Sequence, residues 1–265
     1  MTILEEIAQY TVGRIEEKKK EIPLTELRSV AEALAADTKD SAFRFEKAIK
    51  ADSPMAFICE CKKASPSKGL IEPDFKYLDI AKAYEAAGAT GISVLTEPKW
   101  FLGSDDYLKE IVETVKTPCL RKDFTVDPYM IYQAKALGAS CVLLICSLLE
   151  TEKLKEYIAI ADSLGLSQIV EAHDEKEIES AMDAGARIIG VNNRNLKDFT
   201  VDINNSGRLR AMVPKETLFV AESGIKTRED VATLEAIGVN AVLIGETLMR
   251  AADKKAMINE LKGRM

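Results

Sequence analysis

Phe57–Gly69 has the sequence FICECKKASPSKG, in which an apolar run leads directly into charged residues and then into a loop of Ser, Pro, Lys and Gly. Because side chains on a β-strand alternate between its two faces, Ile58, Glu60 and Lys62 point the same way. A carboxylate and an ammonium therefore end an otherwise apolar strand, although charges are seldom buried without a partner. This segment alone is compatible with a structural ion pair and equally with one part of a functional site.

Short apolar runs of the same kind recur after residue 50 and alternate with amphipathic stretches of helical spacing. The runs are Met55–Cys61, Gly91–Leu95, Pro118–Leu120, Cys141–Cys146, Gln168–Val170, Arg187–Val191, Thr217–Ala221 and Ala241–Ile244. The stretches expected to form helices are Tyr77–Ala87, Asp106–Val115, Pro128–Leu137, Glu152–Leu164, Glu175–Ala184 and Arg228–Ile237. Strands that are apolar on both faces and are joined by helices predict a parallel sheet.

Four glycines mark an internal repeat in this pattern. Gly88, Gly138, Gly185 and Gly238 each end a predicted helix just before a strand, where Gly commonly closes a helix. Successive copies are 50, 47 and 53 residues apart by difference of their numbers, which is the length of two strand–helix units. Eight units in residues 51–265 predict a (β/α)₈ barrel, and residues 1–50 predict a helical extension within the same single domain. An open doubly wound sheet is the alternative, but its typical Gly-rich first turn does not follow the first strand.

The composition restricts the function classes. The chain has 265 residues, 47% of them hydrophobic, and a net charge of −7, which supplies a large core and argues against a nucleic-acid surface or an anionic membrane surface. No apolar run is long enough to cross a bilayer. The odd count of five cysteines, without a secretory signal, favours a reducing cytoplasmic location. His173 is the only histidine, so neither a His-based metal site nor a Ser-His-Asp triad is expected.

Polar residues gather at the carboxyl ends of the predicted strands. In a barrel these ends meet at one rim, where catalytic groups lie. Five of the eight strands end in polar groups, namely Glu60 and Lys62, Arg121–Asp123, Glu171, Asn192–Arg194 and Glu222–Gly224. The other three ends contribute only Glu97 and Glu246. Because so many charges converge, they predict a ligand site rather than isolated ion pairs.

The parity of the strands assigns several of these side chains to the barrel interior. Leu120 shares a face with Lys122, and Ile169 shares a face with Glu171. We therefore expect Lys122 and Glu171 to face each other across a dry cavity, an environment in which pKa values shift.

Glycines after the last two strands predict a phosphate site. Ser223-Gly224 and Gly245-Glu246 each precede a predicted helix. Backbone N–H groups at such turns bind phosphate, and barrels often use the loops after strands seven and eight for this purpose. The Glu246 side chain has to turn away from the anion.

Six motifs, in their order and spacing, closely resemble the indole-3-glycerol-phosphate synthase family: FICECKKASPSKG, LRKDF, IVEAHD, GVNNRNL, VAESGI and LIGETLM. The resemblance covers the whole chain and implies that the helical extension lies over the catalytic end of the barrel. It also implies a carboxy-lyase of tryptophan biosynthesis. The implied reaction closes a ring in 1-(2-carboxyphenylamino)-1-deoxyribulose 5-phosphate and gives indole-3-glycerol phosphate, CO₂ and water. No cofactor or metal is implied.

The resemblance implies a role for each matching residue. Lys122 is the general acid on the carbonyl oxygen, Glu60 and Glu171 serve proton transfer and dehydration in an order left open, and Asn192 orients the intermediate. Lys62 lies between the substrate carboxylate and the phosphate, as a further acid or only as an electrostatic clamp. The residues implied in phosphate binding are Ser65, Arg194, Gly224 and Gly245, with Glu222 and Ser223 lining the pocket and Glu246 standing where several family members have Ser. The residues implied in an apolar slot for the anthranilate ring are Phe101, Leu120, Phe124, Leu143 and Ile244, although Leu143 and Ile244 also fit a purely structural core.

Some alternatives stay open on the sequence alone. The loop Ser65–Gly69 fits a mobile cover over the site and equally an ordinary turn. Other phosphosugar barrels compete, such as phosphoribosylanthranilate isomerase or a Schiff-base aldolase using Lys122, and so does a non-catalytic phosphate-binding barrel. The expected partner is a small phosphosugar substrate. The chain is expected to be a monomer, with association with other enzymes of tryptophan biosynthesis as an open alternative.

Overall fold

Eight parallel strands close into a barrel in the computed structural model, which describes residues 2–37, 41–195 and 199–264. The strands are β1 Ala56–Cys61, β4 Gly91–Leu95, β5 Cys119–Lys122, β6 Cys141–Ile145, β7 Ser167–Ala172, β8 Ile188–Asn192, β9 Leu218–Glu222 and β10 Ala241–Ile244. They pair in the cyclic order β1-β10-β9-β8-β7-β6-β5-β4. Because β1 pairs with both β4 and β10, the sheet has no free edge. The predicted barrel is confirmed and the doubly wound sheet is wrong.

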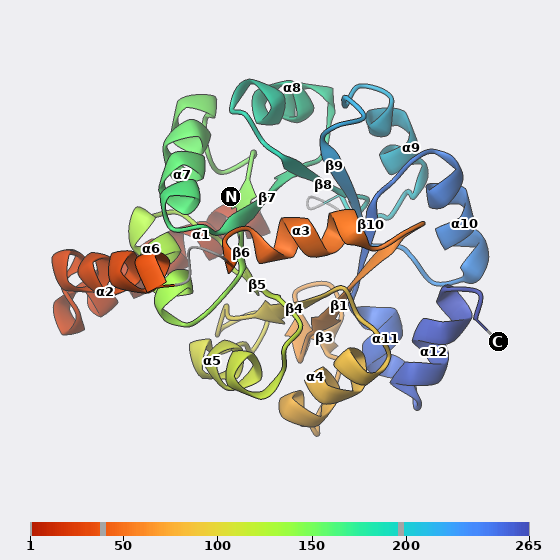
Figure 1. Ribbon diagram of the computed structural model, residues 1–265, viewed down its shortest axis with the longest axis horizontal. Helices are drawn as coiled ribbons and strands as arrows, with labels where there is room; N and C mark the ends of the chain where they lie inside the picture. The colour runs from red at the N-terminus through yellow and green to blue at the C-terminus, as the bar shows by residue number, and fades with distance from the viewer. Residues whose placement is uncertain (1, 38–40, 196–198, 265) are drawn as a thin grey trace.

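Helices surround the barrel (Figure 1). They are α4 Tyr77–Ala86, α5 Asp105–Thr114, α6 Pro128–Ala136, α7 Thr151–Ser163, α8 Glu175–Asp183, α9 Asn204–Arg210, α10 Arg228–Ala236, α11 Glu246–Arg250 and α12 Lys254–Leu261. The repeated glycines after α4, α6, α8 and α10 all have positive φ, between 74° and 83°, which is the left-handed conformation that ends a helix. No helix in the described ranges is long and apolar enough to cross a membrane.

The core has two layers, one inside the barrel and one between the barrel and its helices. Ile58, Leu120, Ile169 and Val220 belong to the inner layer, as strand parity predicts. Ile244 belongs to the outer layer, whereas its neighbour Leu243 points inward.

Four strands extend further than the apolar runs indicate. Strands β5, β7, β8 and β9 continue through Lys122, Ala172, Asn192 and Glu222. The apolar pattern ends earlier because these strands keep pairing while their inward side chains change from apolar to polar or charged. Lys122, Glu171, Asn192 and Glu222 are therefore fixed by hydrogen-bonded strands rather than by loops.

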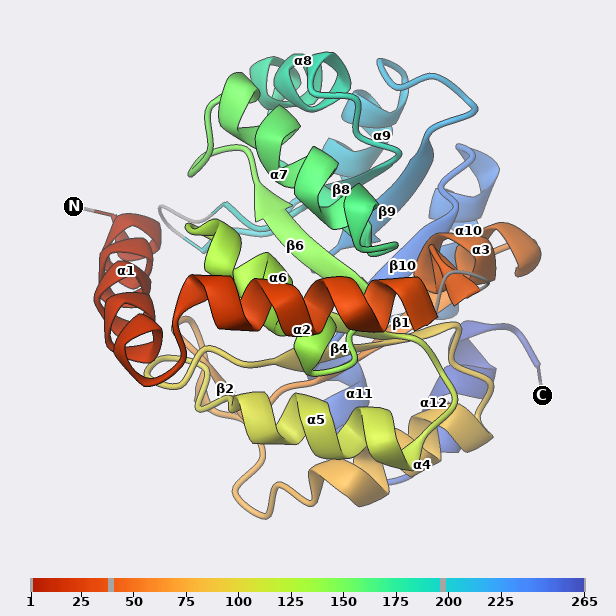
Figure 2. The same ribbon diagram turned by 60° about the vertical axis from the view of Figure 1, so that its left-hand side comes forward.

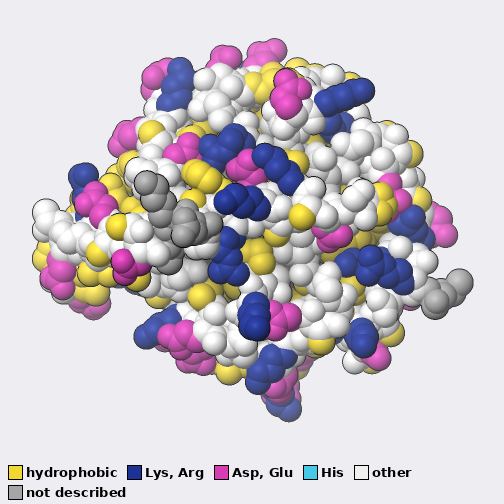
Figure 3. All heavy atoms as spheres, in the orientation of Figure 1, with side chains coloured by type: hydrophobic (Ala, Val, Ile, Leu, Met, Phe, Trp, Pro, Cys, Tyr) yellow, Lys and Arg dark blue, Asp and Glu magenta, His cyan; other side chains and the backbone are white. Residues whose placement is uncertain are grey.

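The N-terminal extension forms helices at both ends of the barrel (Figure 2). Helix α1 (Ile3–Glu21) covers the carboxyl ends of the strands, and α3 (Arg44–Ala51) closes the opposite end. Helix α2 (Leu24–Asp37) runs along the side of the barrel against α6. The expectation that the extension lies over the catalytic end therefore holds for α1 alone, since α3 fills the other end with Phe45 and Ile49. Figure 3 shows the face of the molecule at the end of the barrel that α3 closes, and basic and acidic side chains are interspersed on it.

Helix α1 is held to the barrel by ion pairs and by apolar contacts. A capping box formed by Thr2 and Glu5 starts the helix. The two side chains accept hydrogen bonds from two backbone N–H groups that would otherwise have no partner at a helix start. Leu4 packs on the inner layer of the barrel. Arg14 Nη2 binds Asp123 Oδ1 at 2.8 Å and Lys19 Nζ binds Asp127 Oδ2 at 2.7 Å. These contacts hold α1 in place over the carboxyl ends of the strands.

Candidate active site

A cavity of about 700 Å³ opens at the carboxyl ends of the strands, beneath α1. Its lining includes Glu60, Lys62, Ser65, Phe101, Lys122, Phe124, Leu143, Glu171, Asn192, Arg194, Glu222, Ser223, Gly224, Ile244, Gly245 and Glu246. Leu120 is the exception among the site residues named from the sequence, because it is fully buried in the inner layer below the cavity floor. The structure thus brings residues from strands far apart in the sequence to one mouth.

Lys122 lies at the centre of the polar part of this cavity. Its Nζ is 2.5 Å from Glu222 Oε2 and 3.1 Å from Glu171 Oε2. Burial favours the neutral amine, but the charges of Glu222, Glu171 and Glu60 outweigh it and hold the pKa of Lys122 above its ordinary value. Lys122 is therefore an ammonium that can donate a proton, whereas imine formation requires a lysine with a lowered pKa.

The two carboxylates beside Lys122 differ in protonation. Burial, together with the charges of Glu171 and Glu60, raises the pKa of Glu222 to about 7 despite the attraction of Lys122. For Glu171, burial acts in the same direction, but Lys122, His173 and a hydrogen bond from Asn192 outweigh it and lower the pKa. Glu171 is consequently ionised at neutral pH while Glu222 can hold a proton, an arrangement that separates bases from acids in active sites.

Glu60 and Lys62, at the carboxyl end of β1, form a second charged cluster on the same rim. Lys62 Nζ is 2.5 Å from Glu60 Oε1, and Ser93 Oγ donates a hydrogen bond of 3.2 Å to Glu60 Oε2. Gly245 lies against this pair, because a Cβ at that position would come within 2.9 Å of Lys62 Nζ. A larger residue there would displace the pair from the cavity.

The far side of the cavity is suited to an anion. Ser223 and Gly224 follow β9 with φ values of 66° and 85°, and a left-handed conformation is unusual for Ser. Arg194 lies beside them in the lining, with its backbone N–H bound to Asn192 Oδ1 at 3.0 Å. Glu246 is engaged by Arg250 at 3.1 Å and by Lys68 at 3.7 Å, so cations offset its charge at the rim.

The segment after β1 is a small hairpin rather than an open loop. β2 (Ala64–Ser65) pairs with β3 (Gly69–Leu70) in antiparallel fashion. Ser65 and Lys68 face the cavity from this hairpin. Movement of Ser65–Gly69 as a cover stays a prediction.

The other end of the cavity is aromatic and aliphatic. The rings of Phe101 and Phe124 have centroids 6.0 Å apart, and Ile7 of α1 and Leu143 of β6 also line this part. Such a surface suits a flat apolar ring. The cavity thus joins an apolar slot to a cluster of acids and bases and to an anion subsite.

The comparisons with known proteins identify the family of the chain. Residues 4–261 match the family model described as indole-3-glycerol phosphate synthase. The chain belongs to the indole-3-glycerol phosphate synthase family. The indole-3-glycerol phosphate synthase of Ruminiclostridium cellulolyticum is 60% identical over 98% of this chain and 99% of that protein. The corresponding protein of Leuconostoc mesenteroides subsp. mesenteroides is 52% identical over 98% of this chain and 99% of its own length.

Solved structures of lower similarity share the fold. The 3-hexulose-6-phosphate synthase of Salmonella typhimurium superposes with a TM-score of 0.66 at 15% identity, covering 79% of this chain and 98% of that chain. At this identity the likeness concerns the barrel alone.

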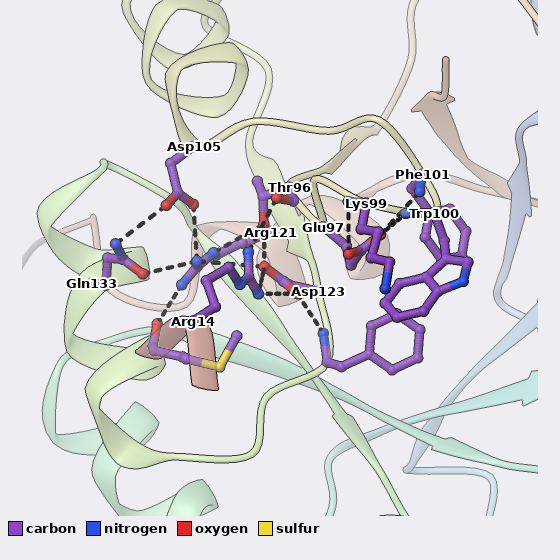
Figure 4. Close-up of polar contacts among 12 residues, drawn as sticks. Arg14, Thr96, Glu97, Lys99, Trp100, Phe101, Asp105, Arg121, Asp123 and Gln133 are labelled. Carbon is purple, nitrogen blue, oxygen red and sulfur yellow. Dashed lines mark hydrogen bonds and ion pairs between the residues drawn. The ribbon is translucent and has the colours of Figure 1, made fainter. Parts of the chain in front are cut away.

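Two strand-end carboxylates to which the sequence patterns gave no role organise the aromatic slot of this indole-3-glycerol phosphate synthase family member (Figure 4). The buried Glu97 carboxylate accepts hydrogen bonds of 2.9, 2.7 and 2.9 Å from the backbone N–H groups of Lys99, Trp100 and Phe101. Asp123 accepts a bond of 2.8 Å from the backbone N–H of Phe124 and binds Arg14 of α1. These two buried carboxylates fix the backbone that carries both rings of the slot. The only sequence signal for Glu97 and Asp123 was a charged residue at the end of an apolar run.

His173 is a further residue outside the predicted site. Its Nε2 lies 3.4 Å from Glu171 Oε1, and its Nδ1 lies 3.0 Å from Glu177 Oε2. The strand parity that placed Glu171 inside the barrel could have indicated His173, two residues further on. Within the described residues no three His, Cys, Asp or Glu side chains are arranged to hold a metal ion.

Proposed function

We propose that this protein catalyses the ring closure of 1-(2-carboxyphenylamino)-1-deoxyribulose 5-phosphate to indole-3-glycerol phosphate, with release of CO₂ and water, and that Lys122 is its general acid. The observation that carries this assignment is the partly buried Lys122 ammonium held between Glu171 and Glu222. The membership in the indole-3-glycerol phosphate synthase family supports the overall reaction.

The binding mode follows from the two ends of the cavity. The substrate carries an apolar aromatic ring at one end and a phosphate at the other. The ring would lie against Phe101 and Phe124, and the phosphate would be bound by Arg194, Ser65 and the backbone after Ser223. Lys62 would then lie near the aromatic carboxylate. This placement brings the ribulose carbonyl beneath Lys122.

The first chemical step forms the carbon–carbon bond. The ring carbon that bears the carboxylate attacks the ribulose carbonyl, and the Lys122 Nζ proton passes to the carbonyl oxygen. An ammonium both donates this proton and stabilises the negative charge that develops on the oxygen. Because Glu171 and Glu222 hold the ammonium from two sides, its position is fixed before the substrate binds.

Two eliminations complete the reaction. Cleavage of the bond to the carboxylate releases CO₂, and its electron pair restores the aromatic ring. The new hydroxyl group then leaves as water, which requires one acid to protonate it and one base to remove a proton from the intermediate. Glu171, which is ionised, is the better base of the pair beside Lys122, whereas the raised pKa of Glu222 suits proton donation. Glu60 remains a further candidate through its contact with Lys62.

We further propose that the protein acts in the cytoplasm, as a monomer and without a cofactor. All five cysteines are free thiols, and four of them are buried, which fits a reducing compartment. Analytical ultracentrifugation tests the oligomeric state, and a sedimentation coefficient of a dimer would contradict the monomer.

Indole fluorescence gives a direct test of the proposed function. The purified protein is mixed with the carboxyphenylamino substrate in the presence of a metal chelator, and the rise in indole fluorescence is followed together with CO₂ release. We expect one CO₂ for each indole product. A folded protein that binds the substrate without forming indole would instead favour a phosphate-binding barrel. A covalent adduct on Lys122 after borohydride treatment would favour a Schiff-base mechanism.

A further inference from the structure

His173, the single histidine of the chain, contacts Glu177 through one ring nitrogen and faces Glu171, a candidate catalytic carboxylate, with the other. Glu177 Oε2 accepts a hydrogen bond of 2.8 Å from the backbone N–H of His173 and lies 3.0 Å from its Nδ1. The Glu177 carboxylate thereby fixes both the ring orientation and a proton on Nδ1. The opposite nitrogen, Nε2, is buried and has no hydrogen-bond partner among the described residues, and it lies 3.4 Å from Glu171 Oε1.

This contact distinguishes Glu171 from Glu222. Both carboxylates touch the Lys122 ammonium. Glu171 receives in addition the amide of Asn192 at 3.3 Å and the imidazole of His173. Glu222 Oε1 has no hydrogen-bond partner within the described ranges. His173 is therefore the cationic group that one carboxylate has and the other lacks.

We propose that His173, oriented by Glu177, is a positioning residue that keeps Glu171 ionised as the proton acceptor of the proposed reaction. The catalytic part of this inference rests on the proposed function, whereas the electrostatic coupling between His173 and Glu171 does not depend on it. The chain of contacts runs from Glu177 on α8 through His173 to Glu171 on β7 and on to Lys122 on β5.

The electrostatic surroundings of the imidazole support this role. Burial disfavours the imidazolium, but the hydrogen bond to Glu177 and the charges of Glu171, Glu177 and Glu222 raise the pKa of His173 above its ordinary value of 6.5. A second cavity of about 530 Å³ adjoins the ring. The charged side chains that line this cavity with His173 are Glu5 of α1, Asp174, Glu177, Arg194 and Asp202.

The sign of the effect follows from linkage. A cation beside a carboxylate favours the ionised form and lowers the pKa of that carboxylate. Removing the imidazolium therefore raises the pKa of Glu171. Because activity requires ionised Glu171, the acid limb of the pH profile of kcat/KM should move to higher pH. An opposite charge at this range shifts a pKa by about one unit or more, which corresponds to about a tenfold loss of kcat/KM on the acid limb.

Nuclear magnetic resonance can test the coupling without any activity. Since His173 is the only histidine, ¹³C-histidine labelling of an untagged chain gives one imidazole signal whose titration reports its pKa. We expect a pKa above 6.5 in the wild type, and a fall of about one unit in each of Glu177→Gln and Glu171→Gln. A wild-type value below 6.5, or a value unchanged in Glu171→Gln, would overturn the inference.

Kinetics then test the catalytic meaning. In His173→Gln, which removes the imidazolium, the acid limb of kcat/KM should lie about one pH unit higher than in the wild type. Glu179→Gln, on the exposed side of α8, is the matched control and should leave the profile in place. A wild type that forms indole while His173→Gln keeps its pH profile refutes the positioning role alone. A wild type without activity refutes the proposed function, and the magnetic resonance titrations still decide the coupling. If His173→Gln does not fold, His173→Asn, which also removes the cation, carries the kinetic test.

Discussion

Replacing Lys122 by methionine removes the ammonium from the cavity while keeping a side chain of similar length. In the wild type this group lies 2.5 Å from Glu222 and 3.1 Å from Glu171, so the substitution removes a cation that both carboxylates contact. The attraction of Lys122 lowers the pKa of Glu222, which is nevertheless about 7. Without Lys122 that pKa rises, and Glu222 takes up a proton at neutral pH. We therefore expect the variant to fold.

The expected loss of activity can be estimated from the two roles of the ammonium. A positioned general acid contributes about 10²–10⁴-fold, and a donor to developing negative charge contributes about 10²–10³-fold. One group supplies both here, so kcat should fall by about 10⁴-fold or more, or about 5.5 kcal/mol of activation free energy. Substrate binding should stay measurable because the phosphate and ring contacts come from other residues.

The assay combines single-turnover indole fluorescence with isothermal titration of the substrate. Lys109→Met, an exposed lysine on α5, is the matched control and should behave as the wild type. A Lys122→Met variant whose kcat stays within tenfold of the wild type would refute the general-acid role. A variant that is folded but no longer binds substrate would show that Lys122 acts in binding.

Three other substitutions test separate parts of the site. Arg194→Ala should raise KM about 10–100-fold with little change in kcat, since a remote phosphate contact is shared by the ground state and the transition state. Glu222→Gln should gain stability relative to the wild type as the pH rises from about 4.5 to about 7. Folding raises the pKa of Glu222, so its contribution to stability is complete below its ordinary pKa of 4.5 and is lost above its folded-state pKa of about 7. The gain should be roughly 3 kcal/mol in chemical denaturation. Glu97→Gln should cost about 1–3 kcal/mol of stability, because an amide group cannot accept all three N–H bonds, and should shift the emission of Trp100, the only tryptophan.

Each of these predictions has a result that contradicts it. A pure loss of kcat in Arg194→Ala would mean that this side chain acts at the reacting centre. A stability difference between Glu222→Gln and the wild type that is constant across pH would mean that Glu222 is ionised throughout. An unchanged Trp100 emission in Glu97→Gln would show that the loop carrying Phe101 keeps its conformation without the carboxylate.

The barrel could be predicted because its signals are local. Glycines that end helices and apolar runs of strand length depend only on neighbouring residues, so Gly88 and Gly138 have the predicted conformation. Strand parity also extends reliably into the rim, where Lys122 and Glu171 face each other. The charge at the end of an apolar run was hence informative before any tertiary contact was known.

Other features depend on tertiary contacts that no local pattern encodes. Nothing in the sequence of α3 indicates that it closes the opposite end of the barrel with Phe45. The short contact between Lys122 and Glu222 requires that β5 and β9 face each other across the barrel. Ile244 lies in the outer layer because the register of β10 turns Leu243 inward instead.

A crystal structure with indole-3-glycerol phosphate bound tests the central claim most directly. We predict that the phosphate lies at Arg194 and the backbone of Gly224, that the indole ring contacts Phe101 and Phe124, and that Lys122 points at the carbon that carried the ribulose carbonyl. A product bound with its phosphate elsewhere, or with Lys122 directed away from the new pyrrole ring, would contradict the account.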